Sequence, residues 1–330
     1  METQVSAKPL STIKDSDLQK ITPFLWFDNQ ALDAANFYAS VFKNARVKTT
    51  TRYSKEGAAA SGVPEGSIMT VSFEIEGQEF TAMNGGPVFR ISPAISFMVN
   101  CRTREKVDDL WVKLSEGGKV MMDLDKYPFS ERYGWVEDKF GVSWQIILGK
   151  DTQIIAPCLM FTKEQCGKAE EAINYYMSLF KNSSVETVQH YEAGEEGPTG
   201  AVKYAAFTIN GQNFKAMDSG IDVPFAFTPA ISFVVNCDTQ QQIDYYWDKL
   251  TRGGDETAQQ CGWLKDKYEV SWQIVPVDLG KMLSDPDPEK SRRVLAALIP
   301  MKKLDLNVLQ RAYEGNGEEE KDILTPKEEL

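Results

Sequence analysis

The chain contains two similar copies of one sequence, each of about 130 residues. The segment SPAISFMVNC at 92–101 recurs as TPAISFVVNC at 228–237, and VSWQII at 142–147 recurs as VSWQIV at 270–275. The spacing between matching residues drifts along the chain, which is typical of domain copies that differ by small loop insertions. Each copy is long enough to bury its own core. We therefore expect two tandem domains of one type, over 20–150 and 151–277.

The composition limits the class of protein and its partners. With 42% hydrophobic and 25% charged residues, the chain is typical of globular proteins. Its net charge of −12 would repel a nucleic acid, and no basic stripe reverses that charge locally. No apolar run approaches the roughly 18 residues of a membrane helix, and the N-terminal arm at 1–19 lacks the apolar centre of a signal peptide. We expect a cytoplasmic protein without nucleic-acid or membrane partners.

The cysteines agree with a reducing compartment. They form an odd set without a CxxC pair, and two of them occupy equivalent places in apolar strands. We expect all five to be reduced thiols. They are Cys101, Cys158, Cys166, Cys237 and Cys261.

Each copy reads as two modules of the order βαβββ. In copy one, 22–27 reads as a strand and 32–42 as a helix, and three strands follow around a Gly/Ala/Ser-rich loop at 57–62. The order repeats with a strand at 94–101, a helix at 104–118 and three more strands. We expect an α+β fold in which the two modules of each copy form a curved sheet around a small-molecule pocket.

The pattern changes after Pro276. Residues 278–313 read as short helices, and Leu295, Leu298 and Ile299 give one of them an apolar stripe. We expect this C-terminal helical extension to dock on the sheets or on a partner subunit. The tail at 314–330 is acidic and has no aromatic residue, which predicts disorder.

Several of these motifs resemble one known family. The strand PFLWFD before a helix with an aromatic pair, the turns GQEF and GQNF, and the endings KFGVSWQI and KYEVSWQI are similar to the PhnB-like branch of the vicinal oxygen chelate superfamily. The resemblance covers about residues 20–276 and implies two tandem glyoxalase-like domains. Members of this branch often carry a 3-demethylubiquinone methyltransferase name. The sequence has no Gly-rich loop between a strand and a helix that would hold S-adenosylmethionine, so we do not expect that activity.

The resemblance also implies where a metal would bind. Metal-using members of the superfamily place two His and one or two Glu on the inner strands. At those positions this sequence has apolar segments near 21–23 and 155–157, Ala94 and Ala230, and the amides of Gln145 and Gln273. A lone amide among apolar neighbours holds a divalent ion poorly. We expect no metal and no other cofactor, and we assign Gln145 and Gln273 to the catalytic set.

His190, the only histidine, is a third catalytic candidate. Histidine side chains titrate near neutral pH and often act as general acids or bases. No residue in the sequence identifies itself as a partner that would orient the ring. A surface or structural role at the end of a strand is the alternative.

Strand alternation predicts which side chains line the pocket, because successive residues point to opposite faces. Phe24, Trp26 and Met83 would form an aromatic-walled cavity with Gln145 as its polar contact, which suits a flat organic molecule. A closed aromatic core is the alternative. The other residues that we assign to ligand binding are Thr70, Ser72, Asn84, Met160, Tyr204 and Asp218; Asn84 and Asp218 could instead cap turns.

The two copies differ in one loop. Copy one is eight residues longer between Trp111 and Trp144 than copy two between Trp247 and Trp272, at 33 positions against 25. The extra loop of copy one, DLDKYPFSERY, is aromatic and acidic. We expect it to cover a working pocket in copy one while copy two serves as a scaffold.

Three functions remain open. The first is a metal-independent protein that binds, and rearranges by isomerase or lyase chemistry, an apolar or aromatic metabolite. The second is non-enzymatic sequestration of the bleomycin-resistance type, and the negative charge would suit a cationic drug. The third is a divalent-metal enzyme of the vicinal oxygen chelate type whose ligands lie elsewhere in the chain. A monomer with internal pseudo-dimer symmetry and a homodimer are both compatible with the duplication.

Overall fold

A computed structural model describes residues 21–149 and 155–316. The predicted N-terminal arm at 1–19 and residues 317–330 of the predicted tail lie outside the described residues.

The chain folds as four successive modules, each with a helix between its first strand and three further strands. Module 1 contains β1 (Ile21–Phe27), α1 (Ala31–Val41), β2 (Ala45–Arg52), α2 (Lys55–Ser61), β3 (Ile68–Ile75) and β4 (Gln78–Asn84). Module 2 contains β5 (Ile95–Cys101), α3 (Arg104–Ser115), β6 (Lys119–Tyr127), β7 (Ser130–Glu137) and β8 (Ser143–Leu148). Module 3 contains β9 (Ile155–Phe161), the 3₁₀ helix η2 (Lys163–Gln165), α4 (Ala169–Leu179), β10 (Ser184–His190), β11 (Val202–Ile209) and β12 (Gln212–Asp218). Module 4 contains β13 (Ile231–Cys237), α5 (Gln240–Leu250), β14 (Asp255–Gln260), β15 (Trp263–Lys265) and β16 (Ser271–Pro276).

The described strands form two eight-stranded sheets, and each sheet combines modules from different copies. Sheet A has the order β14-β15-β16-β13-β1-β4-β3-β2, and sheet B has the order β10-β11-β12-β9-β5-β8-β7-β6. The α+β glyoxalase-like fold is thus confirmed. We expected the two modules of one copy to share a sheet. Instead, module 1 pairs with module 4 through β1 and β13, and module 2 pairs with module 3 through β5 and β9.

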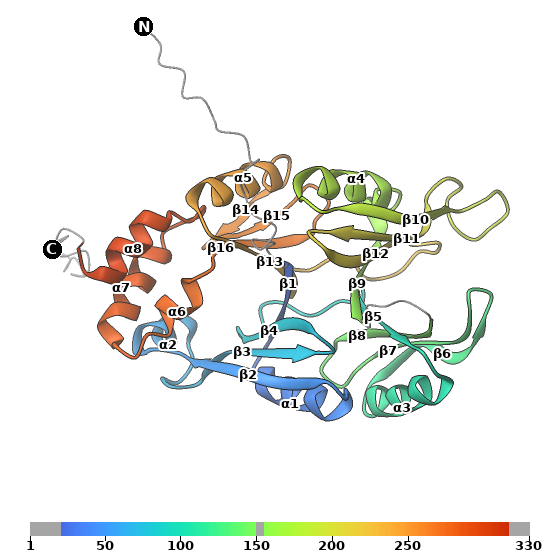
Figure 1. The fold of residues 1–330 in the computed structure, drawn as a ribbon, viewed down its shortest axis with the longest axis horizontal. Helices are drawn as coiled ribbons and strands as arrows, with labels where there is room; N and C mark the ends of the chain where they lie inside the picture. Colours follow the sequence, from blue (N-terminus) through green and yellow to red (C-terminus); the bar gives the residue numbers. More distant parts are fainter. Residues whose placement is uncertain (1–20, 150–154, 317–330) are drawn as a thin grey trace, which may run out of the picture.

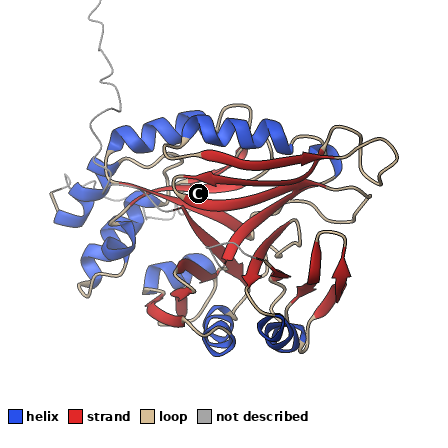
Figure 2. Ribbon diagram, turned by 45° about the vertical axis from the view of Figure 1, so that its right-hand side comes forward, coloured by secondary structure: helices blue, strands red, loops and turns tan. Residues whose placement is uncertain are grey.

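The two modules of one copy meet through their helical sides. Figure 1 shows α1 and α3 along one side of the molecule and α4 and α5 along the opposite side, with the strands between them. Figure 2 shows the same layering after a turn of 45°. Because neighbouring modules are joined in this layer, the free edges of β1 and β5 are left to pair with the other copy. Such pairing removes two exposed sheet edges.

A buried carboxylate fixes each of these helical contacts. Asp138, directly after β7, accepts hydrogen bonds from Tyr38 Oη of α1 and from Trp144 Nε1, both at 2.8 Å. Its other oxygen accepts the backbone N–H groups of Phe140 and Val142. Modules 1 and 2 are therefore tied by one residue with four donors.

Asp266 makes the same contacts between modules 3 and 4. It accepts from Tyr176 Oη at 2.7 Å and from Trp272 Nε1 at 2.9 Å. Burial raises the pKa of Asp266 to about 6, against the opposing effect of these hydrogen bonds. The carboxylate therefore remains ionised at pH 7.5, where charge-assisted hydrogen bonds are strongest.

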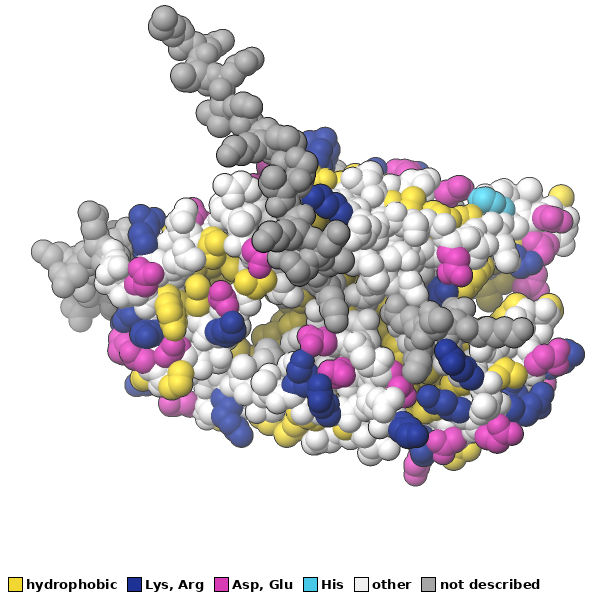
Figure 3. Space-filling model, in the orientation of Figure 1, with side chains coloured by type: hydrophobic (Ala, Val, Ile, Leu, Met, Phe, Trp, Pro, Cys, Tyr) yellow, Lys and Arg dark blue, Asp and Glu magenta, His cyan; other side chains and the backbone are white. Residues whose placement is uncertain are grey.

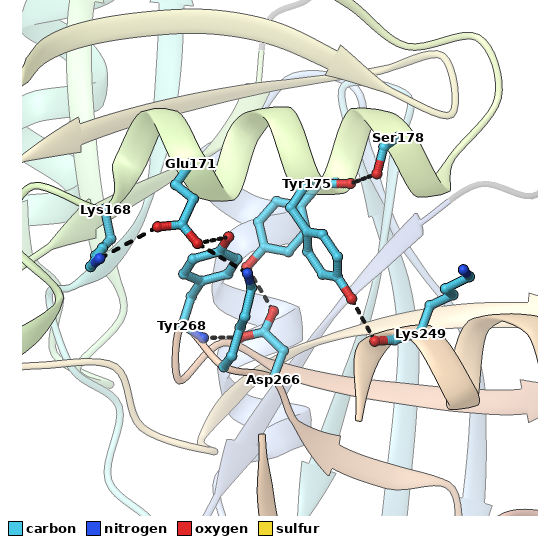
Figure 4. Close-up of polar contacts among 9 residues, drawn as sticks. Lys168, Glu171, Tyr175, Ser178, Lys249, Asp266 and Tyr268 are labelled. Carbon is cyan, nitrogen blue, oxygen red and sulfur yellow. Dashed lines mark hydrogen bonds and ion pairs between the residues drawn. The ribbon is translucent and has the colours of Figure 1, made fainter. Parts of the chain in front are cut away.

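A second contact between modules 3 and 4 lies at the surface (Figure 4). Lys267 Nζ lies 3.0 Å from Glu171 Oε1, and it also lies 4.9 Å and 4.8 Å from the ring centres of Tyr175 and Tyr268. The hydrogen bonds from Lys267 and Tyr268 lower the pKa of Glu171 to about 2. This surface ion pair adds to the buried contact of Asp266.

The segment that we predicted as a loop at 57–62 forms helix α2. The side chain of Ser54 accepts a hydrogen bond from Gly57 N, which caps the helix, and Gly62 ends it with φ at 68°. Ala58 and Ala59 favour a helix more strongly than the composition of the segment suggested. Composition alone was therefore misleading here.

The C-terminal helical extension consists of α6 (Leu279–Leu283), α7 (Pro288–Leu298) and α8 (Leu306–Glu314). It lies beside sheet A, between modules 4 and 1 (Figure 1). Its buried residues form a small core of their own, and Cys261 and Val275 of module 4 pack against that core. Cys261 N donates to Met301 O at 2.8 Å. In the apolar stripe that we predicted, Leu298 is buried whereas Ile299 is exposed.

No helix among the described residues has the length and apolar character needed to cross a bilayer.

Replacing Asp266 by Asn tests the buried contact. An asparagine at this position would set an NH₂ group in place of one acceptor oxygen, and the indole N–H of Trp272 has no means of accepting from it. We expect the substitution Asp266→Asn to lower the free energy of unfolding by about 3 kcal/mol, measured by urea denaturation. Asp109→Asn, at an exposed ion pair, is the matched control and should change it by less than about 0.5 kcal/mol. Equal effects of the two substitutions would contradict this role.

Candidate functional site

Each sheet has one face that the helices leave uncovered, and we call these inner faces face A and face B. In β3, Val71, Phe73 and Ile75 are buried in the core, and Phe73 stacks on Tyr38 of α1. The alternating residues of the same strand, Thr70 and Ser72, therefore point to the inner face. In β1 the same alternation sends Phe24 and Trp26 to face A.

Aromatic side chains of modules 1 and 4 meet across face A. In sheet A, β15 and β1 are three strand spacings apart, which is about 14 Å in a flat sheet. The ring of Trp263 on β15 nevertheless lies 5.4 Å from Phe24 and 6.2 Å from Trp26 on β1. Hydrophobic side chains line a hollow between these halves of the molecule in the space-filling view (Figure 3).

A fourth ring joins these three and completes what we call the aromatic wall. Phe89 follows β4 and meets Trp26 edge to face at 5.1 Å. Trp26 Nε1 donates to Gly86 O at 2.8 Å. A Cβ at Gly85 would lie 2.1 Å from the Trp26 ring, so glycine is required there. The aromatic wall therefore consists of Phe24, Trp26, Phe89 and Trp263, contributed by both copies.

The sequence analysis did not identify Phe89 or Trp263. Phe89 lies in a connection whose path over β1 cannot be deduced from residue patterns. Trp263 matches Trp135 at the same spacing that relates the last strands of the two copies. That spacing could have identified Trp263 as a residue of the inner face.

The rest of face A is open and polar. Trp26, Met83, Thr70 and Ser72 are each half-buried. Gln273 is buried, and its Nε2 donates to Ser232 Oγ at 3.0 Å. These side chains surround the aromatic wall with neutral polar groups.

Face B has different residues at the matching positions. Cys158 replaces Phe24, Met160 replaces Trp26 and Lys215 replaces Thr81, as the pairing registers show. Cys158 and Lys215 are buried. Desolvation raises the pKa of the Cys158 thiol to about 12. Tyr204, which we assigned to ligand binding, is half-buried on this face.

Gln145 lies on face B, away from the cavity residues with which we grouped it. Its Oε1 accepts from Tyr133 Oη and its Nε2 donates to Ser96 Oγ, each at 2.8 Å. Gln273 is the glutamine that shares a face with Phe24, Trp26 and Met83. The modules exchange between copies, so that β13 of copy two pairs with β1, and β16, which carries Gln273, lies beside β13.

The extra loop of copy one also belongs to sheet B. It forms the end of the β6–β7 hairpin, where Tyr127 stacks on Phe129. The loop therefore lies in the sheet of Met160, not in the sheet of Trp26. The expected division into a working copy and a scaffold copy is wrong, because each face is made from both copies.

His190 lies outside both inner faces. Its Nε2 is 2.9 Å from Glu170 Oε2 on α4, and 40% of the His190 side chain is exposed. Since α4 covers the outer side of sheet B, this hydrogen-bonded contact faces away from the candidate sites. The structure thus supplies the orienting partner that the sequence did not show, but on the helical surface.

Asn84 and Asp218 have structural contacts at equivalent strand ends. Asn84 Oδ1 accepts from Ala31 N at 2.8 Å, at the start of α1. Asp218 is buried and accepts from Gly167 N at 2.6 Å and from Val202 N at 2.8 Å. These contacts support the alternative that both residues cap local structure.

The inner faces do not fit a divalent metal ion. Among the described residues, no group of three or more His, Cys, Asp or Glu side chains comes together. Gln145 is held by Tyr133 and Ser96, and the thiol of Cys158 is protonated at neutral pH. We derive no step through a metal.

Two surface recesses lie among loops. One of about 390 Å³ is bordered by Lys163, Cys166 and Glu196, and another of about 300 Å³ by Gln165, Asp255 and Lys267. Neither includes a residue of the aromatic wall.

Comparisons with known proteins agree with this architecture. The profile of a family described as 3-demethylubiquinone-9 3-methyltransferase matches residues 19–147 and again residues 153–275. The chain is 39% identical to a PhnB protein from Bacillus cereus, over 40% of this chain and 100% of that one, with a TM-score of 0.37. A mutant of glyoxalase I from Zea mays is 10% identical over 79% of this chain and 94% of that one, with a TM-score of 0.51. The latter similarity concerns the fold alone. No curated protein matches the chain.

Cysteine labelling tests the burial of face B. Burial raises the pKa of Cys101 to about 11 and that of Cys158 and Cys237 to about 12, so these thiols stay protonated at pH 7.5. We expect iodoacetamide to modify the half-buried Cys166 and Cys261 first, as followed by mass spectrometry. In denaturant all five should react at similar rates. Early labelling of Cys158 in the folded protein would show that face B is open.

Proposed function

The chain belongs to the 3-demethylubiquinone-9 3-methyltransferase family, the PhnB-like branch of the vicinal oxygen chelate superfamily, and we propose that it binds a flat, largely apolar organic molecule on face A. The proposal concerns binding of a small molecule by one chain acting as a monomer in the cytoplasm.

The aromatic wall is the observation that carries this proposal. Trp26, Phe89 and Trp263 are each half-buried, so these residues keep surface that a ligand can cover. Large aromatic rings bury much area when they pack against a ligand, and they prefer other rings in stacked or edge-to-face contact. A flat apolar molecule would remove this surface from water at little cost in side-chain entropy, because the rings already hold one another.

Binding without turnover accounts for the centre of face A. Among the described residues, the side chains that surround the aromatic wall there are hydroxyl, amide and apolar groups, and none of them exchanges a proton near neutral pH. Rearrangement of a ligand next to a carbonyl would need a general base at the bound molecule. His190, our sequence-based candidate for that base, lies on the outer side of sheet B.

Methyl transfer is not supported by the site. A methyl donor such as S-adenosylmethionine carries charge and is usually held where a Gly-rich loop joins a strand to a helix. In the described part of the chain, the connection Asp28–Gln30 contains no glycine, and its counterpart at 162–168 contains only Gly167, so neither is Gly-rich. Membership of the family therefore does not imply that this chain transfers a methyl group.

Substitutions in the aromatic wall test the proposal with 2-naphthol as a flat apolar probe. We expect Trp26→Ala and Trp263→Ala each to weaken its binding about tenfold, because each removes one stacking ring worth about 1–1.5 kcal/mol. Isothermal titration calorimetry measures the affinity directly.

Met160→Ala is the matched control, since Met160 occupies the position of Trp26 on face B. It should change the affinity for 2-naphthol by less than about twofold. Equal losses from Trp26→Ala and Met160→Ala, or none from either, would refute binding on face A.

A further inference from the structure

A strip of hydroxyl groups lies beside the aromatic wall on face A. In the register of sheet A, Thr51 is opposite Thr70, Ser72 is opposite Thr81, and Thr81 lies next to Phe24. Thr51 and Thr70 share a hydrogen bond of 2.6 Å. The strip thus crosses three adjacent strands, β2, β3 and β4, and ends at the wall.

Two of these hydroxyl groups are available to a ligand. Within residues 21–149 and 155–316, the side chains of Ser72 and Thr81 have no hydrogen-bond partner, and both are half-buried on the inner face. A partly buried hydroxyl without a partner is satisfied by water or by a bound molecule. The strip therefore offers at least two open donors and acceptors.

Face B shows that the fold does not require these hydroxyls. The residues that match Thr51, Thr70, Ser72 and Thr81 in sheet B are Gln189, Tyr204, Ala206 and Lys215. The same strands, in the same registers, therefore form without the strip. The hydroxyls are a property of face A and not of the module.

Gln273 adds an available hydrogen-bond acceptor to face A. It is only 6% exposed and points to face A, and its Nε2 is bonded to Ser232. Among the described residues no donor reaches its Oε1. On face B the matching oxygen, of Gln145, accepts from Tyr133. Cys261 takes the place of Tyr133 in module 4, so the acceptor of Gln273 is left for water or for a ligand hydroxyl that displaces it.

The charged groups of face A lie at strand ends and are already paired. At the β3–β4 turn, Glu74 pairs with Arg46 at 3.1 Å and Glu79 pairs with Lys48 at 2.6 Å. Lys265 ends β15, two residues after Trp263 and opposite Ser271, and it is paired with Asp255 at 3.8 Å. A charged ligand in the middle of the face would lose hydration without gaining an opposite charge, which is costly.

From these contacts we propose that the ligand of face A is an uncharged molecule with two parts, a flat aromatic ring on the aromatic wall and a polyhydroxylated part on the hydroxyl strip, as in an aromatic glycoside. This inference rests on the proposed function, because it names the chemical class of the molecule that face A binds.

Three probes with the same ring test the inference by calorimetry. They are 2-naphthol, which has the ring alone; 2-naphthyl β-D-glucopyranoside, which adds an uncharged sugar; and 2-naphthyl β-D-glucuronide, which adds the same sugar with a carboxylate. We expect the glucoside to bind about tenfold more tightly than 2-naphthol and about tenfold more tightly than the glucuronide.

The double variant Ser72→Ala/Thr81→Val locates the sugar. We expect it to weaken the glucoside at least about fivefold and to leave 2-naphthol within about twofold, since it removes hydroxyls and keeps the aromatic wall. The matched control Thr187→Val removes a hydroxyl from β10 of sheet B, opposite Ala206, and should leave the affinity for the glucoside unchanged. Circular dichroism would verify that both variants are folded.

The outcomes separate this inference from the proposed function. This inference alone fails if 2-naphthol binds in a Trp26-dependent manner but the sugar adds no selective affinity. That result would be a glucuronide that binds as tightly as the glucoside, or a glucoside that binds no more tightly than 2-naphthol. It also fails if the double variant weakens 2-naphthol and the glucoside equally. If the binding of 2-naphthol does not depend on Trp26, the proposed function fails and the inference fails with it.

Discussion

Two strand pairings between copies, β1 with β13 and β5 with β9, determine the rest of this structure. They join four-stranded units into continuous sheets and bring residues from distant parts of the chain together, so that Phe24 lies opposite Ser232. The buried carboxylates of Asp138 and Asp266 join the modules in the other combination, within each copy. The four modules therefore form a closed ring of contacts, and no single copy contains a complete inner face.

This arrangement explains how one duplicated unit carries two different faces. Face A receives Phe24 and Trp26 from module 1 and Trp263 from module 4, whereas face B receives Cys158 from module 3 and Gln145 from module 2. A change in one copy alters one half of each face. The aromatic wall and the hydroxyl strip have thus accumulated on one face while the other is filled by its own hydrogen bonds, as in the contact of Tyr133 with Gln145. The C-terminal helical extension packs beside sheet A, against Cys261 and Val275.

Much of this fold is predictable from the sequence, because duplication, helical spacing and strand alternation are local patterns. The alternation in β1 and β3 correctly separates Phe73 in the core from Thr70 and Ser72 on the inner face. The exchange of modules is not predictable in this way, since β13 and β5 have nearly identical sequences and either could pair with β1 on local grounds. The misplacement of Gln145 follows from that ambiguity, as does the failure to identify Trp263.

Local chemistry explains the other differences between prediction and structure. His190 is a reasonable catalytic candidate by residue type, yet its strand position directs it to Glu170 on the helical side. Asn84 and Asp218 accept hydrogen bonds from backbone N–H groups at the starts of α1 and α4. A polar residue at the end of a strand does not show in the sequence which backbone group it will contact.

A crystal structure of the full chain with 2-naphthyl β-D-glucopyranoside would test the central claim most directly, namely that the two copies build one ligand site together. The account predicts the naphthyl ring packed on the aromatic wall, in contact with both Trp26 of copy one and Trp263 of copy two, with the sugar over Ser72 and Thr81. A ring bound on face B, or one in contact with residues of a single copy only, would contradict it.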